Sequence, residues 1–471
     1  MVSIGFDRAR AALPLRRLVV LTLAIILVAA CAPPGAVSTN AAATPAPSGS
    51  TGASSGPSTS AAATGPNCGT QPVKLNAYFE TGFDLPFKLS EEFTKQFPNV
   101  TWDIKQDQFT NLMSATPRLL SGDNPPDLIR LPSMVTLVKD GLLKNLDEYV
   151  TAFGWDKFPA AQLAQNRVAS DGTRGSGSLY AAGLNYSLTG VFYNKKLAQQ
   201  IGMAASPTTV AEFEDLLGKA KSAGLQPIMM WNATASGGGL AFPLQNLMAA
   251  YGPTQPINDW IFQKPGATID TPTNLTAAQH LQQWVKAGYF PKDVNAIEYT
   301  DANARFGKGQ GVFMFNGDWQ NAVYDKDMSS NVGFFVFPPG EASGSLAAMS
   351  APLTYGISAK AKNADCAAFF FNWVATNDKA REIDVAVGGS NPGGPPDLSL
   401  PQATASVTNE TLRAGADVAK DNGAMDFIAN ATGSIFAQGW TPELQKVVGG
   451  KQDAAGLLKA VQAEYAKELA R

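Results

Sequence analysis

The sequence predicts an α/β fold in which helices cover a parallel sheet. Two observations support this prediction. Segments with the alternating apolar pattern of strands are separated by segments with apolar residues at helical spacing, and the pattern recurs along the chain. About 400 residues, from Asn67 to Arg471, carry it, which is enough for two domains of ordinary size.

The first part of this region supplies a regular alternation of elements. We expect strand 73–79, helix 85–97, strand 100–104, helix 112–120 and strand 128–131. Pro98 ends the first helix, and the turn at 122–127 ends the second. Strands that alternate with helices in this way are typical of a parallel sheet.

The rest of the chain continues the alternation. We expect a strand at 191–193, a helix at 209–221, strands at 227–231 and 311–315, and a final helix at 453–470. Thr209 is the predicted N-cap of its helix, and Glu212, three residues later, completes a capping box. Each of the two later strands ends in a polar loop, where functional side chains are expected in an α/β fold.

Residues 1–30 are predicted to be a signal peptide. A basic start with four arginines precedes the apolar run 18–30, which is too short to span a membrane. The run ends in Val-Ala-Ala-Cys31, which resembles a bacterial lipobox, and this resemblance implies that Cys31 is lipidated and becomes the mature N-terminus. The alternative is ordinary cleavage nearby, with Cys31 incidental.

Residues 31–66 are predicted to be a disordered tether, because they are almost wholly Ala, Pro, Ser, Thr and Gly. Removal of residues 1–30 takes the net charge from −3 to about −6. An acidic chain without Lys/Arg clusters in its sequence argues against nucleic acid or anionic lipid as a partner. The membrane is therefore reached through the lipid anchor alone.

The remaining two cysteines, Cys68 and Cys366, are a candidate disulfide in an oxidising compartment, and free buried thiols are the alternative.

The single histidine, His280, lies in a Gln/Ala-rich helix with no Cys, His or acidic cluster around it in the sequence. This pattern disfavours Ser-His-Asp and Cys-His catalysis and most zinc sites. We expect no metal, no cofactor and no enzymatic activity.

Several motifs together resemble the extracellular solute-binding proteins of ABC importers, of the maltose-binding type. They are 92–98 (EFTKQFP), 121–127 (SGDNPPD), 141–147 (GLLKNLD), 189–195 (TGVFYNK), 206–213 (SPTTVAEF) and 306–319 (FGKGQGVFMFNGDW). Each motif alone is loose, but their order and spacing hold over residues 73–471. The chain is therefore identified as a member of this family.

The resemblance implies two α/β lobes with a ligand cleft between them. Lobe 1 would comprise 67–184 and 352–395, and lobe 2 would comprise 188–350 and 400–471. Both Cys68 and Cys366 then fall in lobe 1, which favours the disulfide. The implied protein is a monomer on the extracytoplasmic face of the membrane that captures a carbohydrate and delivers it to permease subunits served by a separate ATPase.

Candidate ligand-binding residues follow from the chemistry of sugar binding, in which aromatic faces stack on the ring and polar groups hydrogen-bond its hydroxyls. We expect such residues just after strands. By this rule the candidates are Trp319, Asp318, Trp231 and Asn232, with Glu80 at the close of the first strand. The resemblance implies three more: Asn185 and Tyr186, which precede the crossover strand, and Trp440, which opens the penultimate helix. For Asp318 a helix cap is an equal alternative, and for Trp440 core packing is the stronger one.

Two features limit what the resemblance implies. After the segment that corresponds to residues 126–127 and its strand, maltose-binding protein has aromatic and charged ligand groups. This chain has Leu131-Pro132-Ser133 there, so a maltodextrin ligand is not supported. Two rival functions remain open: a lipid-anchored ligand sensor without transport, and a glycoside hydrolase or lyase, which needs only two carboxylates. Turnover of reducing ends would identify the enzyme.

Overall fold

The computed structural model describes residues 65–131 and 133–470, which belong to one compact unit. The predicted signal peptide, Cys31 and all but the last two residues of the predicted tether lie outside the described residues. Within residues 65–131 and 133–470, no helix is both long and apolar enough to cross a membrane.

The first described segment forms the β/α alternation that its sequence predicts. Strands β1 (Val73–Glu80), β2 (Val100–Asp107) and β3 (Leu128–Arg130) are parallel, and α1 (Leu85–Gln96) and α2 (Phe109–Ser121) connect them. Smaller elements complete this part of the fold: α3 (Val135–Lys139), α4 (Asp147–Phe153), η1 (Trp155–Lys157), α5 (Ala160–Ala164), β4 (Arg167–Val168), β5 (Ser178–Leu179), α13 (Ala364–Thr376), α14 (Asp378–Ile383) and the π-helix η6 (Asp384–Gly388).

The second part of the fold is richer in helices. Its elements are α6 (Lys195–Gln200), α7 (Val210–Ser222), η2 (Thr234–Ser236), α8 (Ala241–Tyr251), α9 (Thr254–Ile261), α10 (Pro272–Lys286), η3 (Val294–Ala296), α11 (Tyr299–Gly307), β7 (Phe313–Gly317), η4 (Asp318–Gln320), α12 (Asn321–Met328), η5 (Ser329–Asn331), β8 (Val332–Phe335), α15 (Ser406–Lys420), β10 (Ala424–Met425), η7 (Ile428–Asn430), the π-helix η8 (Ile435–Trp440), α16 (Thr441–Val448) and α17 (Ala454–Leu469).

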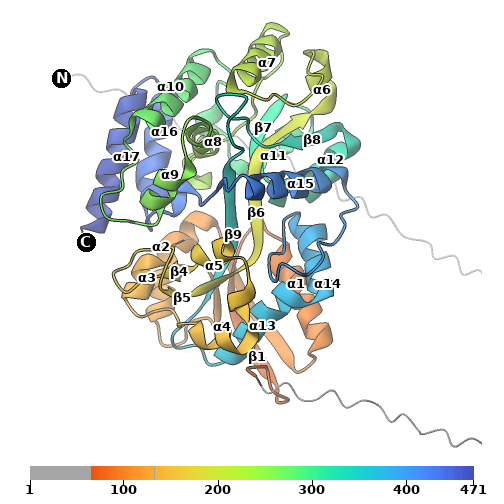
Figure 1. Ribbon diagram of the computed structural model, residues 1–471, viewed down its shortest axis with the longest axis vertical. Coiled ribbons are helices and arrows are strands. Elements are labelled where there is room, and N and C mark those ends of the chain that lie inside the picture. The colour runs from red at the N-terminus through yellow and green to blue at the C-terminus, as the bar shows by residue number, and fades with distance from the viewer. Residues whose placement is uncertain (1–64, 132, 471) are drawn as a thin grey trace, which may run out of the picture. The chain divides into compact units, whose positions relative to one another are not determined.

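Two long strands pass through both parts. They are β6 (Ala181–Asn194) and β9 (Ala348–Ile357), and they pair antiparallel in a sheet with the order β2-β1-β3-β9-β6-β7. β8 also pairs with β6, and β10 pairs with β9. In Figure 1 both strands run from the lower to the upper half of the molecule, so the sheet joins the two halves.

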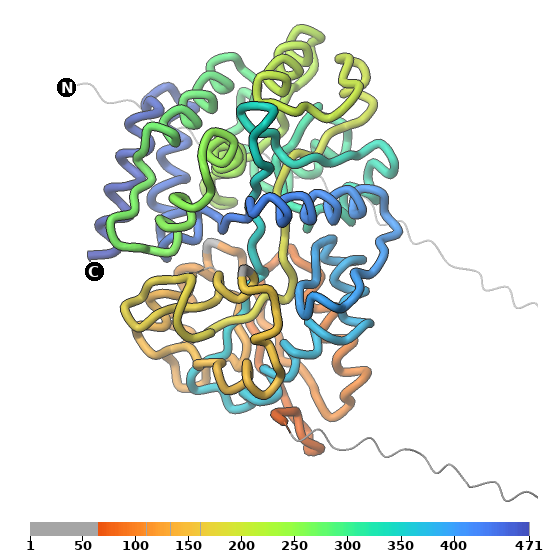
Figure 2. The backbone as a smooth tube through the Cα atoms, viewed as in Figure 1, coloured from red at the N-terminus to blue at the C-terminus, as the bar shows by residue number. Residues whose placement is uncertain are grey.

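Buried hydrophobic residues form separate cores on either side of a narrow boundary in β6 and β9. Two clusters lie within 68–184 and 353–380, and the largest cluster lies within 188–351 and 407–465. We call the first body lobe 1 and the second lobe 2. A third connection, between η6 and α15, also rises from lobe 1 to lobe 2 (Figure 2).

A disulfide joins Cys68 to Cys366 within the core of lobe 1. Cys68 stands five residues before β1, and Cys366 lies in the first turn of α13. The bond therefore connects the entry of the chain into lobe 1 with a helix almost 300 residues later in the sequence.

Local sequence signals explain several element boundaries, but one predicted strand does not form. Thr209 Oγ1 accepts a hydrogen bond from the Glu212 N–H (3.2 Å), as a capping box requires, but the Glu212 carboxylate reaches back to the Thr208 N–H (2.7 Å). The predicted strand at 227–231 is wrong, because only an isolated bridge between Ile228 and Phe313 forms there. Pro227 has no N–H to donate to a ladder.

Candidate functional site

A cavity of about 160 Å³ lies between the lobes. Lobe 1 contributes the loop 82–85 after β1, and lobe 2 contributes Trp319 and Gln320 of η4. Asn185 and Ser187 line it from the crossing strand β6. The cavity therefore brings together residues that lie more than 200 positions apart and meet only because the sheet passes through both lobes.

Trp319 is placed by the tight turn at the end of β7. A Cβ at Gly317 would lie 2.0 Å from the indole ring, so only glycine allows the ring this close to the strand. The Nε1–H donates to the Tyr299 hydroxyl (2.8 Å), which also accepts from the Gln320 amide (2.7 Å). Burial raises the pKa of Tyr299 to about 12, so its hydroxyl stays neutral. These bonds fix the indole edge and leave the ring half-buried beside the cavity.

Trp319 begins a continuous row of aromatic rings on lobe 2. Its ring centroid lies 6.2 Å from Phe242, Phe242 lies 4.9 Å from Phe427, and Phe427 lies 5.5 Å from Phe436. We call Trp319, Phe242, Phe427 and Phe436 the aromatic row. Aromatic rings of this kind offer flat apolar faces and specific edge-to-face contacts.

Rings from lobe 1 meet both ends of the aromatic row. Phe83, in the loop after β1, lies 6.4 Å from Trp319, and Phe109, at the start of α2, lies 6.3 Å from Phe436. Both follow parallel strands of lobe 1, so they lie at the carboxyl edge of the sheet, where α/β proteins bind ligands. The two lobes therefore face one another through aromatic side chains.

Asn185 supplies an unsatisfied hydrogen-bond acceptor at the cavity. Its side chain is buried, and its Oδ1 has no hydrogen-bond partner among the described residues. A buried amide oxygen without a partner carries a free-energy cost of about 1–3 kcal/mol, which a ligand hydroxyl would relieve. Ser187 and Gln320 add further polar groups to the same wall.

The Asp318 carboxylate joins two of the connections between the lobes by hydrogen bonds and does not face the cavity. Its carboxylate accepts hydrogen bonds from the Leu188 N–H (3.0 Å) and the Ser390 hydroxyl (2.7 Å), which belong to two different crossings between the lobes. Burial raises the pKa of Asp318 well above its usual range, against the effect of these hydrogen bonds. Both carboxylate oxygens therefore already have a hydrogen-bond partner on one of the crossings, and Asp318 is not among the residues that line the cavity.

Glu80 lies at the end of β1 and pairs with Arg130 at the end of β3. Glu80 Oε2 lies 3.0 Å from Arg130 Nε, and the guanidinium also donates to the backbone oxygen of Thr354. Burial raises the pKa of Glu80, and the adjacent Arg130 opposes this shift. The guanidinium stands 5.8 Å from the ring of Phe109, so Glu80 orients a cation beside one of the lobe 1 rings.

Three sequence-predicted residues lie in the core of lobe 2, away from the cavity. Trp231 packs against Tyr299 (4.7 Å), Asn232 donates to Asn295 Oδ1 (2.7 Å), and the Trp440 Nε1–H donates to the Ile428 oxygen (3.2 Å). All three are buried and none lines the cavity. Trp231 instead supports Tyr299, the residue that fixes Trp319.

Tyr186 is also displaced from the cavity. It follows Asn185 on β6, and successive residues of a strand point to opposite faces. Its ring packs against Gly393, where a Cβ would lie 2.3 Å from the ring, and burial raises the pKa of its hydroxyl. Tyr186 therefore packs the third connection against lobe 1 and does not line the cavity that holds Asn185.

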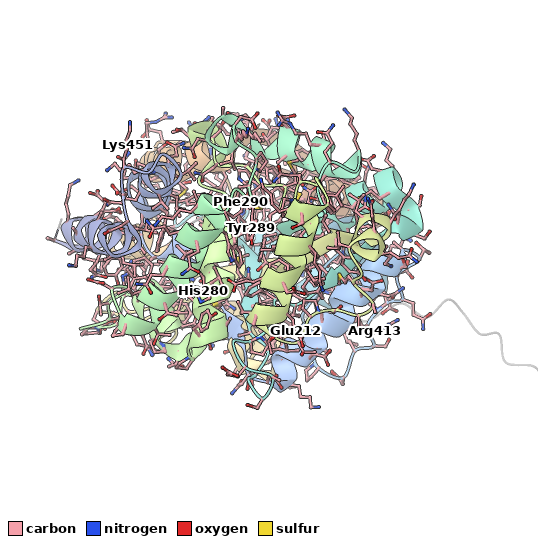
Figure 3. All side chains as sticks on the ribbon, turned by 90° about the horizontal axis from the view of Figure 1, so that it is seen from above. Glu212, His280, Tyr289, Phe290, Arg413 and Lys451 are labelled. Carbon is pink, nitrogen blue, oxygen red and sulfur yellow. A yellow bond between two sulfur atoms is a disulfide. The ribbon has the colours of Figure 1, made fainter. Side chains whose placement is uncertain are left out.

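His280 has partners that its sequence neighbourhood does not reveal. Nδ1 lies 2.6 Å from Glu214 Oε1, and Nε2 lies 2.8 Å from the Tyr251 hydroxyl. Burial alone would raise the pKa of Glu214, but hydrogen bonds from His280 and Trp284 lower it overall. Helices α7 and α10 bring Glu214 to His280, which Figure 3 labels.

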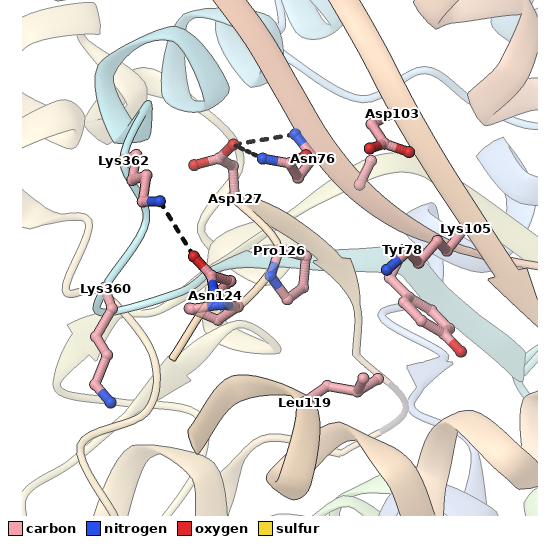
Figure 4. A pocket seen from close by; sticks show the side chains of 12 residues that line it. Asn76, Tyr78, Asp103, Lys105, Leu119, Asn124, Pro126, Asp127, Lys360 and Lys362 are labelled. Atoms are coloured by element: carbon pink, nitrogen blue, oxygen red, sulfur yellow. Dashed lines mark hydrogen bonds between the residues drawn. The ribbon is translucent and has the colours of Figure 1, made fainter. Parts of the chain in front are cut away.

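A larger hollow of about 290 Å³ lies on lobe 1 (Figure 4), away from the cavity. Its lining includes the 124–127 loop at the amino end of β3, opposite the strand ends that face lobe 2. Asp127 accepts from the Asn76 N–H (3.0 Å), and Lys362 donates to Asn124 (3.2 Å). These polar groups pair with one another.

Comparisons with known proteins agree on one family and fold. Residues 76–381 match the sequence profile of a family described as bacterial extracellular solute-binding protein. A chitin oligosaccharide binding protein has a similar structure, with a TM-score of 0.70 and 20% identity over 85% of this chain and 99% of that protein. None of the curated protein sequences compared with the chain matches it.

Two further solved structures show the same fold. The maltose-bound MalE3 of T. maritima has a TM-score of 0.66 and 17% identity over 84% of this chain and 99% of that protein. The solute-binding protein RafE in complex with raffinose has a TM-score of 0.63 and 19% identity, with coverages of 84% and 99%. The two-lobed arrangement is therefore shared with proteins of very different sequence.

Proposed function

Because the chain belongs to the family of bacterial extracellular solute-binding proteins, we propose that it is the substrate-binding subunit of an ABC importer and that its ligand is a carbohydrate. It binds a mono- or oligosaccharide outside the cytoplasm and delivers it to permease subunits, with ATP hydrolysed by a separate chain. A lipid on Cys31 keeps this monomeric receptor beside the membrane.

The observation that carries the carbohydrate proposal is the half-buried ring of Trp319 at the cavity, together with Phe83 on the facing lobe. A pyranose presents a weakly polar C–H face that stacks on an aromatic ring, and hydroxyls at its rim need hydrogen-bond partners. Trp319 supplies a ring face at the cavity, and Asn185 Oδ1 supplies a buried acceptor without a partner. The names of the similar structures, which include chitin oligosaccharide, maltose and raffinose, point in the same direction.

Lobe closure is the proposed mechanism. A ligand that touches lobe 1, lobe 2 and the crossing strand makes all its contacts only when the lobes approach, so it shifts the equilibrium toward the closed form. Hinge closure of this kind is documented for periplasmic binding proteins as a class. We assign 67–184 and 352–395 to the first moving body and 188–350 and 400–471 to the second.

The size of the cavity supports entry through an open form. Ligand sites usually measure about 300–1,000 Å³, and the cavity between the lobes measures about 160 Å³. Rotation about the crossings widens this space while Trp319 and Asn185 keep their own supports, because each is fixed within its element.

Binding rather than hydrolysis is the function that the cavity favours. Glycoside hydrolases of the usual type need two carboxyl groups, about 5–10 Å apart, on either side of the scissile bond. Among the described residues that line the cavity, Asp84 is the only one with a carboxylate. A single carboxylate can accept a hydrogen bond from a sugar hydroxyl, which suits a receptor.

A thermal-shift screen tests the proposal. The chain from residue 31 onward, with Cys31→Ser, is melted alone and with mono- and oligosaccharides, polyols, amino acids and glycerol phosphate. A ligand at one hundred times its Kd adds about 2.7 kcal/mol to the free energy of unfolding, which raises Tm by a few degrees. Stabilisation by an amino acid and by no sugar would contradict the carbohydrate proposal.

A further inference from the structure

One ion pair connects the two lobes. Arg174, in the hairpin between β4 and β5 of lobe 1, places Nη2 2.6 Å from Oδ2 of Asp426, which follows β10 in lobe 2. The two side chains are 8% and 2% exposed. Every other ion pair within residues 65–131 and 133–470 joins two residues of the same lobe.

Each partner is fixed by its own lobe. Arg174 Nη2 also donates to the Gln165 oxygen (2.8 Å) in lobe 1. Asp426 Oδ1 accepts from the Phe427 N–H (2.7 Å) and the Asn430 amide (2.8 Å) in lobe 2. Neither side chain can follow the other without breaking these bonds, so the pair reports the relative position of the lobes.

Arg174 makes two further contacts with lobe 2. Its backbone N–H donates to the Phe262 oxygen (2.9 Å), and its guanidinium stands 4.9 Å from the centre of the Phe262 ring. A cation over an aromatic face gains about 0.5–2 kcal/mol, with the larger values where water is excluded. The hairpin is therefore joined to α9 as well as to Asp426.

The pair lies beside a crossing strand. β10 pairs with β9 through Met425 and Met349, and the Gln165 amide donates to the Ser350 oxygen (2.9 Å). A buried charge that loses its partner is strongly destabilising, because the remaining charge is not compensated by water. Loss of either Arg174 or Asp426 therefore favours arrangements of the lobes in which water reaches the other.

We propose that Arg174 and Asp426 form an interlobe latch. Before any ligand binds, the latch holds the two lobes in the arrangement seen here, in which both lobes line the cavity. The role of the latch in binding rests on the proposed function. The latch sets the fraction of the protein that is in the binding-competent form. The larger the fraction of receptor already in this form, the less closure reduces the apparent affinity for the ligand.

Small-angle X-ray scattering without sugar tests the latch. The chain from residue 31 onward, with Cys31→Ser, is compared with the Arg174→Met and Asp426→Asn variants and with the double variant. Each single variant should have a larger radius of gyration than the parent. The double variant should be no larger than either single variant, because residues that act as one pair are non-additive.

A matched control pair lies wholly within lobe 2. Lys195 and Glu410 are 3.0 Å apart, so Lys195→Met should leave the radius of gyration unchanged. For the sugar with the largest shift in the thermal screen, the affinity of each latch variant should fall by roughly 5- to 150-fold, the usual range of coupling between two states. The control should keep the parent affinity.

Two outcomes would overturn the latch. One is a parent-like or smaller radius of gyration for both folded single variants, and the other is failure of both to fold, which would assign the pair to folding. If only Arg174→Met fails to fold, the radius of gyration of the Asp426→Asn variant alone tests the latch, because Asn has the size of Asp. A parent chain that binds no sugar would remove the proposed function and leave the scattering comparison intact.

Discussion

Trp319 combines a fixed edge with an accessible face. Its Nε1–H is bonded to Tyr299 and its ring packs on Phe242, so the indole has one orientation before a ligand arrives. The same ring lines the cavity and faces Phe83 on the other lobe. Preorganisation of this kind lowers the entropy that binding would otherwise lose.

Replacement of Trp319 by Ala should weaken sugar binding more than it weakens the fold. Loss of a stacking face costs about 1–3 kcal/mol of binding free energy, or roughly a 5- to 150-fold higher Kd. The free energy of unfolding should fall by only about 1–2 kcal/mol, because one hydrogen bond and part of a ring contact are lost. Calorimetric titration and urea unfolding of the same variant measure the two effects.

Trp440 is the matched control, because it is a tryptophan of the same lobe with no exposed surface. Trp440→Ala should lower the free energy of unfolding by about 3–5 kcal/mol and leave the Kd unchanged in the folded protein. An unchanged Kd in Trp319→Ala, beside a large loss of stability, would move Trp319 into the same class as Trp440.

Sequence reasoning could find residues at strand ends but could not say which way they point. The rule selects Trp319, which lines the cavity, and also Trp231, which is in the core. Asn185, which also lines the cavity, comes from the family resemblance and not from this rule. Phe83 and Phe109 satisfy the same rule and were missed, since their contacts form only between the lobes. The direction in which a side chain points depends on strand register and on lobe packing, and a local sequence pattern contains neither.

At the scale of single elements, η6 is an unusual connection between α14 and the third crossing. It is a π-helix, a geometry that is rare and often occurs near functional sites. Asp384, its first residue, is fully buried, and neither carboxylate oxygen has a hydrogen-bond partner among the described residues. Burial raises the pKa of Asp384 well above its usual range, although Arg381 opposes this shift.

Asp384 should make the protein less stable as the pH rises. Between the ordinary pKa of 3.8 and the raised value, the folded state keeps a proton that the unfolded chain has lost. The free energy of unfolding therefore falls with rising pH in this window. In Asp384→Asn the fall between pH 4 and pH 8, measured by urea unfolding, should be smaller.

Asp156→Asn, at an exposed position of lobe 1, controls for the loss of one carboxylate. Equal slopes for Asp384→Asn and the parent would show that Asp384 is ionised in both states. Other titrating groups are common to all three proteins and cancel in the comparison.

Most elements of the first half were predictable because their signals are local. β1 and α1 match their predicted ranges within a residue, since alternation and Pro98 mark their limits. β6 was predicted as the short strand 191–193 and runs over fourteen residues. Its extra length depends on pairing with β9, β7 and β8, which no neighbouring residue reveals.

At the scale of the whole molecule, the proposed lipid on Cys31 decides where the receptor works. Replacement of Cys31 by Ser should release the protein into the medium or leave it unprocessed, because the described residues contain no helix able to cross a membrane. Fractionation of cells, followed by immunoblotting of membrane and medium, measures this. Membrane attachment that survives the substitution would exclude Cys31 as the anchor.

The disulfide between Cys68 and Cys366 has a mechanical consequence. Any tension on the chain ahead of Cys68 would otherwise act on β1, whose strand pairs with β2 and β3 would have to resist it. The covalent bond transmits this load to α13 instead, beneath the core of lobe 1. With the proposed lipid on Cys31 and the proposed lobe closure, lobe 1 would be the fixed support and lobe 2 the body that moves.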